Sequence, residues 1–278
     1  HDNWNKYNYR WWVDSEIMKK SLLVLFLLFF NNATAVEFNG KFIQGHFIIG
    51  KTKPNTQILI DKKKIKVTKD GYFAFGIEKD RKLDIVITEG DTKIVKKIQK
   101  RKYKIQRIDG LAKKKVTPPE EFYERIKREN KLIGDAREIH SDLTFFKDKF
   151  ILPVDDAIIT GVYGSQRILN GIPKWPHYGL DFAQKKGTPI KAMNNGIVTL
   201  AEEDLFYTGA TLIFDHGHGI STLYMHMDKI FVAKGDHVKK GDIIATVGAS
   251  GRSTGPHLDV RLNWFGTRLD PATILNIK

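Results

Sequence analysis

Three short motifs in the second half of the chain contain histidine and aspartate side chains. His177 and Asp181 are separated by three residues, and His226 follows later, after an aromatic residue and a methionine. His257 and Asp259 come last, and the residues after them alternate between apolar and polar types. That alternation predicts a strand, on which His257 and Asp259 point to the same side. Imidazole and carboxylate groups are the usual zinc ligands other than thiolates, so the motifs predict a site with three protein ligands and water.

These motifs resemble those of the lysostaphin/LytM-type zinc endopeptidases, which cut the peptide part of bacterial peptidoglycan. That family has H-x-x-x-D, then a lone histidine after an aromatic residue, then H-x-H. The surrounding sequence is also similar to the family, in residues 181–182, 187–190, 215–219 and 248–255. The resemblance extends from about residue 150 to the end of the chain. One position differs, because the last histidine of the family, a metal ligand, is Asp259 here.

The resemblance implies a role for each residue of the motifs. His177, Asp181 and Asp259 occupy the metal-ligand positions. His226 and His257 occupy the positions that hold the water or stabilise the transition state, work for which a group that titrates near neutral pH is suited. The implied cofactor is one Zn²⁺ per chain, which lowers the pKa of bound water and polarises a carbonyl group.

Aspartate at position 259 changes the charge of the expected site. Two carboxylates and one imidazole cancel the charge of Zn²⁺, so the metal should acidify bound water less than with one carboxylate. Carboxylate oxygen also suits harder ions, so another divalent metal such as Mn²⁺ is a possible occupant. Our first hypothesis is an endopeptidase that hydrolyses the peptide cross-links of peptidoglycan. The alternative is a catalytically impaired wall-binding protein that regulates or activates another wall hydrolase, which implies a regulatory protein partner.

Composition and charge limit the other classes of function. The chain has 278 residues, enough for about two domains, and no cysteine, which excludes disulfides and thiolate metal sites. Most of the net charge of +14 comes from residues 36–150, which hold 29 basic and 17 acidic residues, whereas residues 151–278 hold 13 and 12. A basic field attracts polyanions. In an exported protein we expect the cell wall or anionic lipid to be the target, and no nucleic-acid partner.

The N-terminal region has the pattern of a secretory signal peptide. Met18-Lys19-Lys20 is a short positive start, residues 22–30 are all apolar, and Ala33-Thr34-Ala35 has the small-x-small form of a cleavage site. The apolar run is shorter than the roughly 20 residues that span a bilayer, although an uncleaved anchor stays an alternative. Residues 1–35 are therefore expected to be an N-terminal extension and signal peptide ending near Ala35. The location predicted from them is the periplasm or cell envelope.

The remaining sequence predicts a mainly β protein. Short runs of β-branched and aromatic residues predict an immunoglobulin-like β-sandwich over 36–105, with a hairpin turn at Asp70-Gly71. A linker over 106–149 contains an expected helix at about 118–146, with Thr117 and Glu120 as a capping box. Residues 150–278 are expected to be an antiparallel β metallopeptidase domain with a groove. We also place the linker helix near that groove as a weaker hypothesis.

Five other histidines have less informative surroundings. His216 and His218 belong to a glycine-rich segment, so we expect them to be loop residues. His140 is interpreted as an ordinary surface residue of the linker, and nothing in the sequence around His46 or His237 suggests a role.

Overall fold

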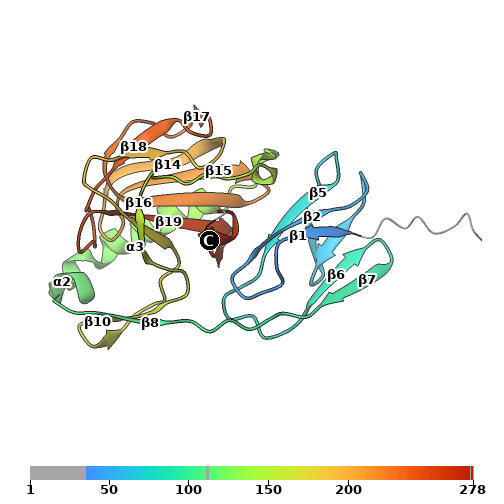
Figure 1. The fold of residues 1–278 in the computed structure, drawn as a ribbon, viewed down its shortest axis with the longest axis horizontal. Helices are drawn as coiled ribbons and strands as arrows, with labels where there is room; N and C mark the ends of the chain where they lie inside the picture. Colours follow the sequence, from blue (N-terminus) through green and yellow to red (C-terminus); the bar gives the residue numbers. More distant parts are fainter. Residues whose placement is uncertain (1–35, 111–112, 276, 278) are drawn as a thin grey trace, which may run out of the picture. The chain divides into compact units, whose positions relative to one another are not determined.

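The structure is a computed structural model that describes residues 36–110, 113–275 and 277 (Figure 1). The expected signal peptide and N-terminal extension, residues 1–35, lie outside the described residues. Among the residues described, no helix combines the length and the apolar character needed to cross a membrane. Strands dominate, as the sequence predicts.

The N-terminal strands form two antiparallel sheets. One sheet has the order β1 (Glu37–Asn39), β2 (Phe47–Lys51), β5 (Tyr72–Gly76). The other has the order β4 (Lys63–Ile65), β3 (Ile58–Ile60), β6 (Ile85–Glu89), β7 (Thr92–Lys96). Isoleucine and phenylalanine side chains from both sheets share one buried cluster. These sheets form the β-sandwich expected for this region.

The predicted hairpin at Asp70-Gly71 is wrong. The turn exists, with the Gly71 amide donating to the Thr68 carbonyl at 2.9 Å. However, β4 pairs with β3, and β5 pairs with β2, so the turn connects the two sheets. A local turn signal fixes the reversal of the chain, but packing of the apolar faces decides which strands pair.

The C-terminal region is built on a ten-stranded sheet. Its main path has the order β17 (His237–Val238), β14 (Gly196–Leu205), β15 (Gly209–Gly217), β16 (Ile220–Ile230), β19 (His257–Trp264), β12 (Leu180–Ala183), β9 (Ile158–Gly161). Off this path, β13 (Pro189–Lys191) pairs with β18 (Ile243–Val247), β18 also pairs with β16, and β20 (Thr267–Leu269) pairs with β19. Every pairing within this sheet is antiparallel, as predicted.

A smaller sheet contains part of the expected linker. β8 (Ile105–Ile108) pairs in parallel with β10 (Gln166–Leu169), which pairs with β11 (Ile172–Pro173) (Figure 1). The chain from 36 to 278 is one compact unit. The domain boundaries that the sequence suggests within it therefore stay predictions.

The linker helix is shorter than expected. α2 (Lys113–Val116) and a 3₁₀ turn (Glu120–Phe122) precede α3 (Tyr123–Arg137), and two further 3₁₀ turns lie at Phe145–Lys147 and Pro271–Thr273. Thr117 does not cap α3, because Pro119 has an extended backbone that delays the helix. The buried Ala136 of α3 and the half-buried Leu132 and Ile133 contact a cluster of side chains from β14, β15 and β16. α3 therefore covers one face of the large sheet.

A third cluster joins the sandwich to the large sheet. It contains Phe47 and Ala74 from the sandwich, and Leu262 and Leu269 from β19 and β20. Leu269 lies directly against Gly76, where a methyl group would collide with it. Arg101 and Asp270 form an ion pair at 2.5 Å beside this cluster. The contact is thus apolar at its centre and charged at its edge.

We expect Leu269→Ala to lower the free energy of unfolding of the chain by about 2–5 kcal/mol, because it leaves a cavity at a fully buried position. Urea denaturation measures the change. Leu83→Ala is the matched control, since Leu83 is 75% exposed and its truncation should cost within about 0.5 kcal/mol. Equal effects of the two substitutions would contradict the packing described here.

Candidate metal centre

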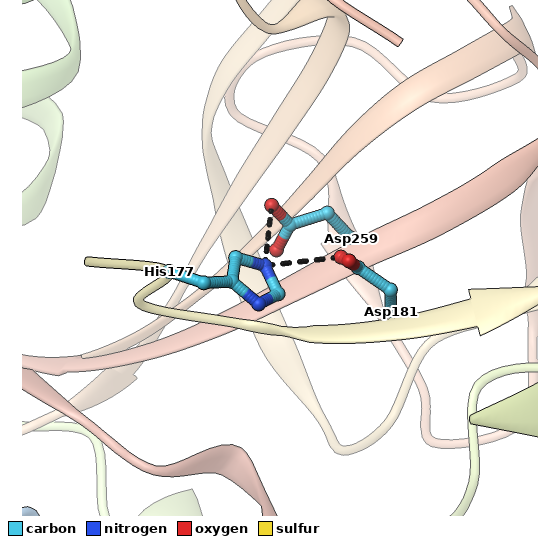
Figure 2. Close-up of side chains that lie close together, drawn as sticks. All are labelled: His177, Asp181 and Asp259. Carbon is cyan, nitrogen blue, oxygen red and sulfur yellow. Dashed lines mark hydrogen bonds and ion pairs between the residues drawn. The ribbon is translucent and has the colours of Figure 1, made fainter. Parts of the chain in front are cut away.

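The pairing of β12 with β19 brings two carboxylates together. Asp181 and Asp259 are direct register partners on these antiparallel strands. His177 lies three residues before β12, and its backbone is held by hydrogen bonds to Gly164 and Ser165 at 2.7 and 2.8 Å. All three side chains point toward one another (Figure 2), with ligand atoms within 4.8 Å, and all three are buried. These three residues are the metal ligands that we predict from the sequence.

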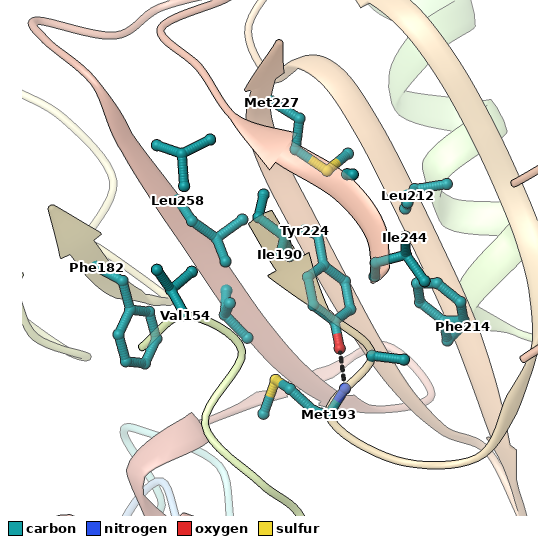
Figure 3. Packing of buried hydrophobic residues seen from close by; sticks show 14 of the residues in the cluster. Val154, Phe182, Ile190, Met193, Leu212, Phe214, Tyr224, Met227, Ile244 and Leu258 are labelled. Carbon is teal, nitrogen blue, oxygen red and sulfur yellow. Dashed lines mark hydrogen bonds between the residues drawn. The ribbon is translucent and has the colours of Figure 1, made fainter. Parts of the chain in front are cut away.

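Strand alternation places the group on one face of the sheet. The neighbours Leu180, Phe182, Leu258 and Val260 point to the opposite face, into the main apolar core. Figure 3 shows Phe182 and Leu258 in that core, beside Tyr224. Asp181 and Asp259 therefore lie on the face that α3 covers.

The imidazole of His177 lies between the two carboxylates. Its Nε2 atom is 3.0 Å from Asp181 Oδ1 and 3.3 Å from Asp259 Oδ2. Burial is the largest single effect and lowers the pKa of His177, but the combined attraction of the two carboxylates outweighs burial and raises it. In the absence of a metal, a proton on His177 thus offsets part of the negative charge.

One arginine contacts each carboxylate, at its Oδ2 atom. Arg167 Nη2 from β10 lies 3.2 Å from Asp181 Oδ2, and Arg261 Nη2 lies 3.2 Å from Asp259 Oδ2. Burial raises the pKa of Asp259, but the charges of Arg261 and His177 prevail and hold it below its usual range. Asp259 is therefore an ionised carboxylate.

Two glycines leave room for these carboxylates. A methyl group on Gly161 would collide with Asp181 Oδ2, and one on Gly179 would collide with Asp259 Oδ1. The close approach of the backbone thus holds both side chains in place.

His226 occupies a strained position in the middle of β16. β16 pairs with β19 as far as Met225 and with β18 from Met227, so His226 lies where the strand changes partner. Its φ of 65° is in the left-handed region, which is uncommon for a residue other than glycine. Such strain is often found at functional sites, where it aims a side chain that a regular strand would direct elsewhere.

Hydrogen bonds fix the same tautomer in both remaining histidines. His226 Nδ1 lies 2.9 Å from the Ser250 carbonyl, and His257 Nδ1 lies 2.9 Å from the Gly255 carbonyl. A carbonyl only accepts, so each Nδ1 carries a hydrogen, and in the neutral ring Nε2 is the nitrogen that can accept a proton. Burial lowers the pKa of His226 to about 4, so its imidazole is neutral at pH 7. The two rings are 4.9 Å apart and line a cavity of about 360 Å³ together with Asp181.

The residues present fit a divalent metal. Asp259 Oδ1 is buried and has no hydrogen-bond partner among the described residues, and Asp181 Oδ1 is buried and faces the imidazole of His177 at 3.0 Å. Each carboxylate thus has one oxygen next to an arginine and another that contacts no arginine, and His177 Nε2 adds a nitrogen donor. One nitrogen and two oxygens form a donor set that binds zinc and harder divalent ions.

Two arginines of the site were not predicted from the sequence, and one histidine predicted to lie in a loop lies in a strand. Arg261 follows Asp259 by two residues on the same strand, so the alternation that paired His257 with Asp259 also indicated Arg261. Arg167 could not be found in this way because it comes from another sheet. His216 is not a loop residue: it lies in β15, fully buried, and bonds the Asn195 carbonyl and Thr222 at 2.7 and 2.8 Å.

Part of the chain that contains the site matches a known protein family. Residues 175–271 match the family description "Peptidase family M23", and this part of the chain is a peptidase M23 domain. It spans His177, Asp181, His226, His257 and Asp259, whereas Arg167 lies before it. Within it lie the motifs that resemble lysostaphin/LytM-type enzymes.

Curated relatives match about a third of the chain. The DD-carboxypeptidase/endopeptidase Mpg of Neisseria meningitidis is 37% identical over 98 residues, which are 35% of this chain and 22% of Mpg. The peptidoglycan DD-endopeptidase ShyB of Vibrio cholerae is 45% identical over 83 residues, 30% of this chain and 19% of ShyB. The chain thus matches about a fifth of the length of these relatives.

A solved structure matches more of the fold. A Pseudomonas aeruginosa crystal structure assigned provisionally to peptidase M23 is 25% identical and has a TM-score of 0.63. The match covers 84% of this chain and 95% of that chain. The likeness therefore extends well beyond residues 175–271.

We expect Gly179→Ala to lower the free energy of unfolding by about 1–3 kcal/mol, because the new methyl group must displace Asp259. Urea denaturation of metal-free protein measures this without reference to metal binding. Gly134→Ala in α3 is the control, since a methyl group there meets nothing within 4 Å and alanine favours a helix. A loss no larger than that of the control would contradict the close approach of Gly179 to Asp259.

Proposed function

We propose that this chain is a zinc-dependent endopeptidase that hydrolyses peptide cross-links of bacterial peptidoglycan in the periplasm or cell envelope. The main support is the arrangement of His177, Asp181 and Asp259 beside two histidines whose Nδ1 atoms each donate to a backbone carbonyl. The M23 domain and relatives described as peptidoglycan DD-endopeptidases favour this substrate class. We propose His177, Asp181 and Asp259 as the metal ligands, and His226 and His257 as catalytic residues.

Each residue of the site has a part in the proposed reaction. A bound zinc would supply an acidified water molecule and polarise the scissile carbonyl. His226 is neutral at pH 7 and offers its Nε2 lone pair, so it can accept a proton from the attacking water. The ring centre of His257 lies 4.9 Å from that of His226, so His257 can hold the reacting groups or deliver a proton to the leaving amine. Gly255 and Ser250 keep both rings in the productive tautomer.

A second candidate function is a wall-binding regulator without catalysis. Two observations favour it: arginines already accompany both carboxylates, and His177 Nδ1 has no hydrogen-bond partner among the described residues. A histidine that binds a metal usually donates from its other nitrogen to a carboxylate, carbonyl or water. Five family positions are nevertheless occupied by groups able to bind or catalyse, which is why we prefer the enzyme.

The proposed enzyme should release cross-linked peptide fragments from purified sacculi. We expect residues 36–278 to show this activity, to lose it in 1,10-phenanthroline, and to regain it with Zn²⁺ or Mn²⁺. His226→Ala should lower the rate by about 10²–10⁴-fold, because it removes the proposed proton acceptor. Chromatography of the released fragments measures both effects. Binding of sacculi without release, at any metal supplied, would favour the regulator.

We expect Asp259→His to raise the affinity for zinc, because an imidazole replaces a harder carboxylate ligand. Competition with a chromophoric chelator measures the change in dissociation constant. Asp91→His is the control, since Asp91 is exposed in a turn of the sandwich. An affinity equal to that of the control would exclude contact between residue 259 and the metal.

A further inference from the structure

A second, larger cavity adjoins the candidate metal centre on the face that α3 covers. Its volume is about 750 Å³, and both His177 and His226 line it. Six basic residues line this cavity and no acidic residue does: Arg137, Arg167, Lys174, Arg252, Arg261 and Arg268. We call it the arginine cavity. We propose, on the basis of the proposed function, that it is a subsite that binds the free carboxylates of the peptide substrate.

Three of these arginines have no carboxylate partner. Arg167 and Arg261 pair with Asp181 and Asp259, but no described residue forms an ion pair with Arg137, Arg252 or Arg268. The Nε atom of Arg137 is buried and has no hydrogen-bond partner among the described residues. A buried donor without an acceptor costs free energy, which a ligand bearing acceptors recovers.

The arginines also repel one another. Burial, and then repulsion from Arg268 and Arg261, lowers the pKa of Arg137 to about 10. Burial and repulsion from Arg261 likewise lower the pKa of Arg268. Positive charges held close together without a counter-charge are unfavourable, and bound carboxylates relieve the repulsion.

Aromatic rings hold two of the guanidinium groups in place without neutralising them. Arg252 lies 4.3 Å from the ring centre of Tyr207, and Arg268 lies 4.6 Å from that of Tyr178. A guanidinium that is fixed in this way keeps its N–H donors in a fork that matches the two oxygens of a carboxylate. The cavity is therefore preorganised for carboxylate groups.

The position of the cavity indicates a peptide ligand more than a free ion. It shares Arg167, Leu169, His226 and Arg252 with the smaller cavity of the catalytic histidines, so its occupant lies next to the reacting bond. Its volume exceeds that of a small anion, and apolar side chains, including Trp175 and Ile133, complete its lining. An aliphatic peptide with free carboxylates matches this mixture of surfaces.

Calorimetry on the full chain tests this inference. The probe is a peptidoglycan stem tripeptide with free carboxylates, compared with the same tripeptide amidated at those groups. The tripeptide lacks a cross-link, so binding is measured without turnover. The protein is first stripped of metal with 1,10-phenanthroline, an uncharged chelator, because a polycarboxylate chelator would itself occupy the arginine cavity.

We expect the acidic tripeptide to bind and the amidated one to bind at least about tenfold more weakly, because charge-assisted hydrogen bonds are lost. Arg137→Gln and Arg268→Gln should each weaken binding of the acidic form by about tenfold or more. Added salt should weaken binding further. Arg128→Gln, on an exposed position of the same helix as Arg137, makes the same charge change and should have no more than a small effect.

Several results would overturn the inference. They are equal binding of both tripeptides, no binding of the acidic one, or equal effects of Arg137→Gln and Arg128→Gln. Binding of inorganic phosphate in place of the acidic tripeptide would assign the cavity to a free ion, and this result would also overturn the inference. Absence of hydrolysis together with specific tripeptide binding would instead count against the proposed function alone.

Discussion

The repulsion between Asp181 and Asp259 is the constraint on which the rest of the site depends. Like charges directly opposite one another on antiparallel strands are unfavourable, yet these two are buried register partners. The surroundings supply positive charge from His177, Arg167 and Arg261. The arginines contact only the Oδ2 atoms, so a metal at the Oδ1 atoms would add further positive charge. The fold can hold this pair because β12 and β19 continue into an apolar core on their other face.

The arginines change what Asp259 implies for a bound metal. Two carboxylates alone cancel the charge of Zn²⁺, which predicts weakly acidified water. Arg167 and Arg261 lie against the two carboxylates and offset part of their negative charge. If both carboxylates bind a metal as we propose, they would then donate less charge to it, and Arg261 would compensate for the aspartate at position 259.

Local patterns were sufficient for some of these features and insufficient for others. Period-two alternation predicted that His257 and Asp259 share a face, and the motif spacing brought together His177 and Asp181. The hairpin at Asp70-Gly71 was wrong because sheet packing, a long-range effect, selected other partners. Arg167 was missed for the same reason, since it lies in β10, in a different sheet from the β12 strand that carries Asp181. The left-handed backbone of His226 depends on the change of strand partner and has no signal in its own sequence.

The distribution of charge shows how the linker contributes to the site. Residues 151–278 are almost neutral in total, but their arginines gather on one face, and no acidic residue lines the cavity there. α3 completes that cavity with Ile126, Ile133 and Arg137, which belong to the basic middle of the chain. The linker helix is thus a wall of the proposed subsite, beyond its role of connecting two regions. A strand domain cut free of α3 would keep the carboxylates and histidines but lose part of the surface that recognises the substrate.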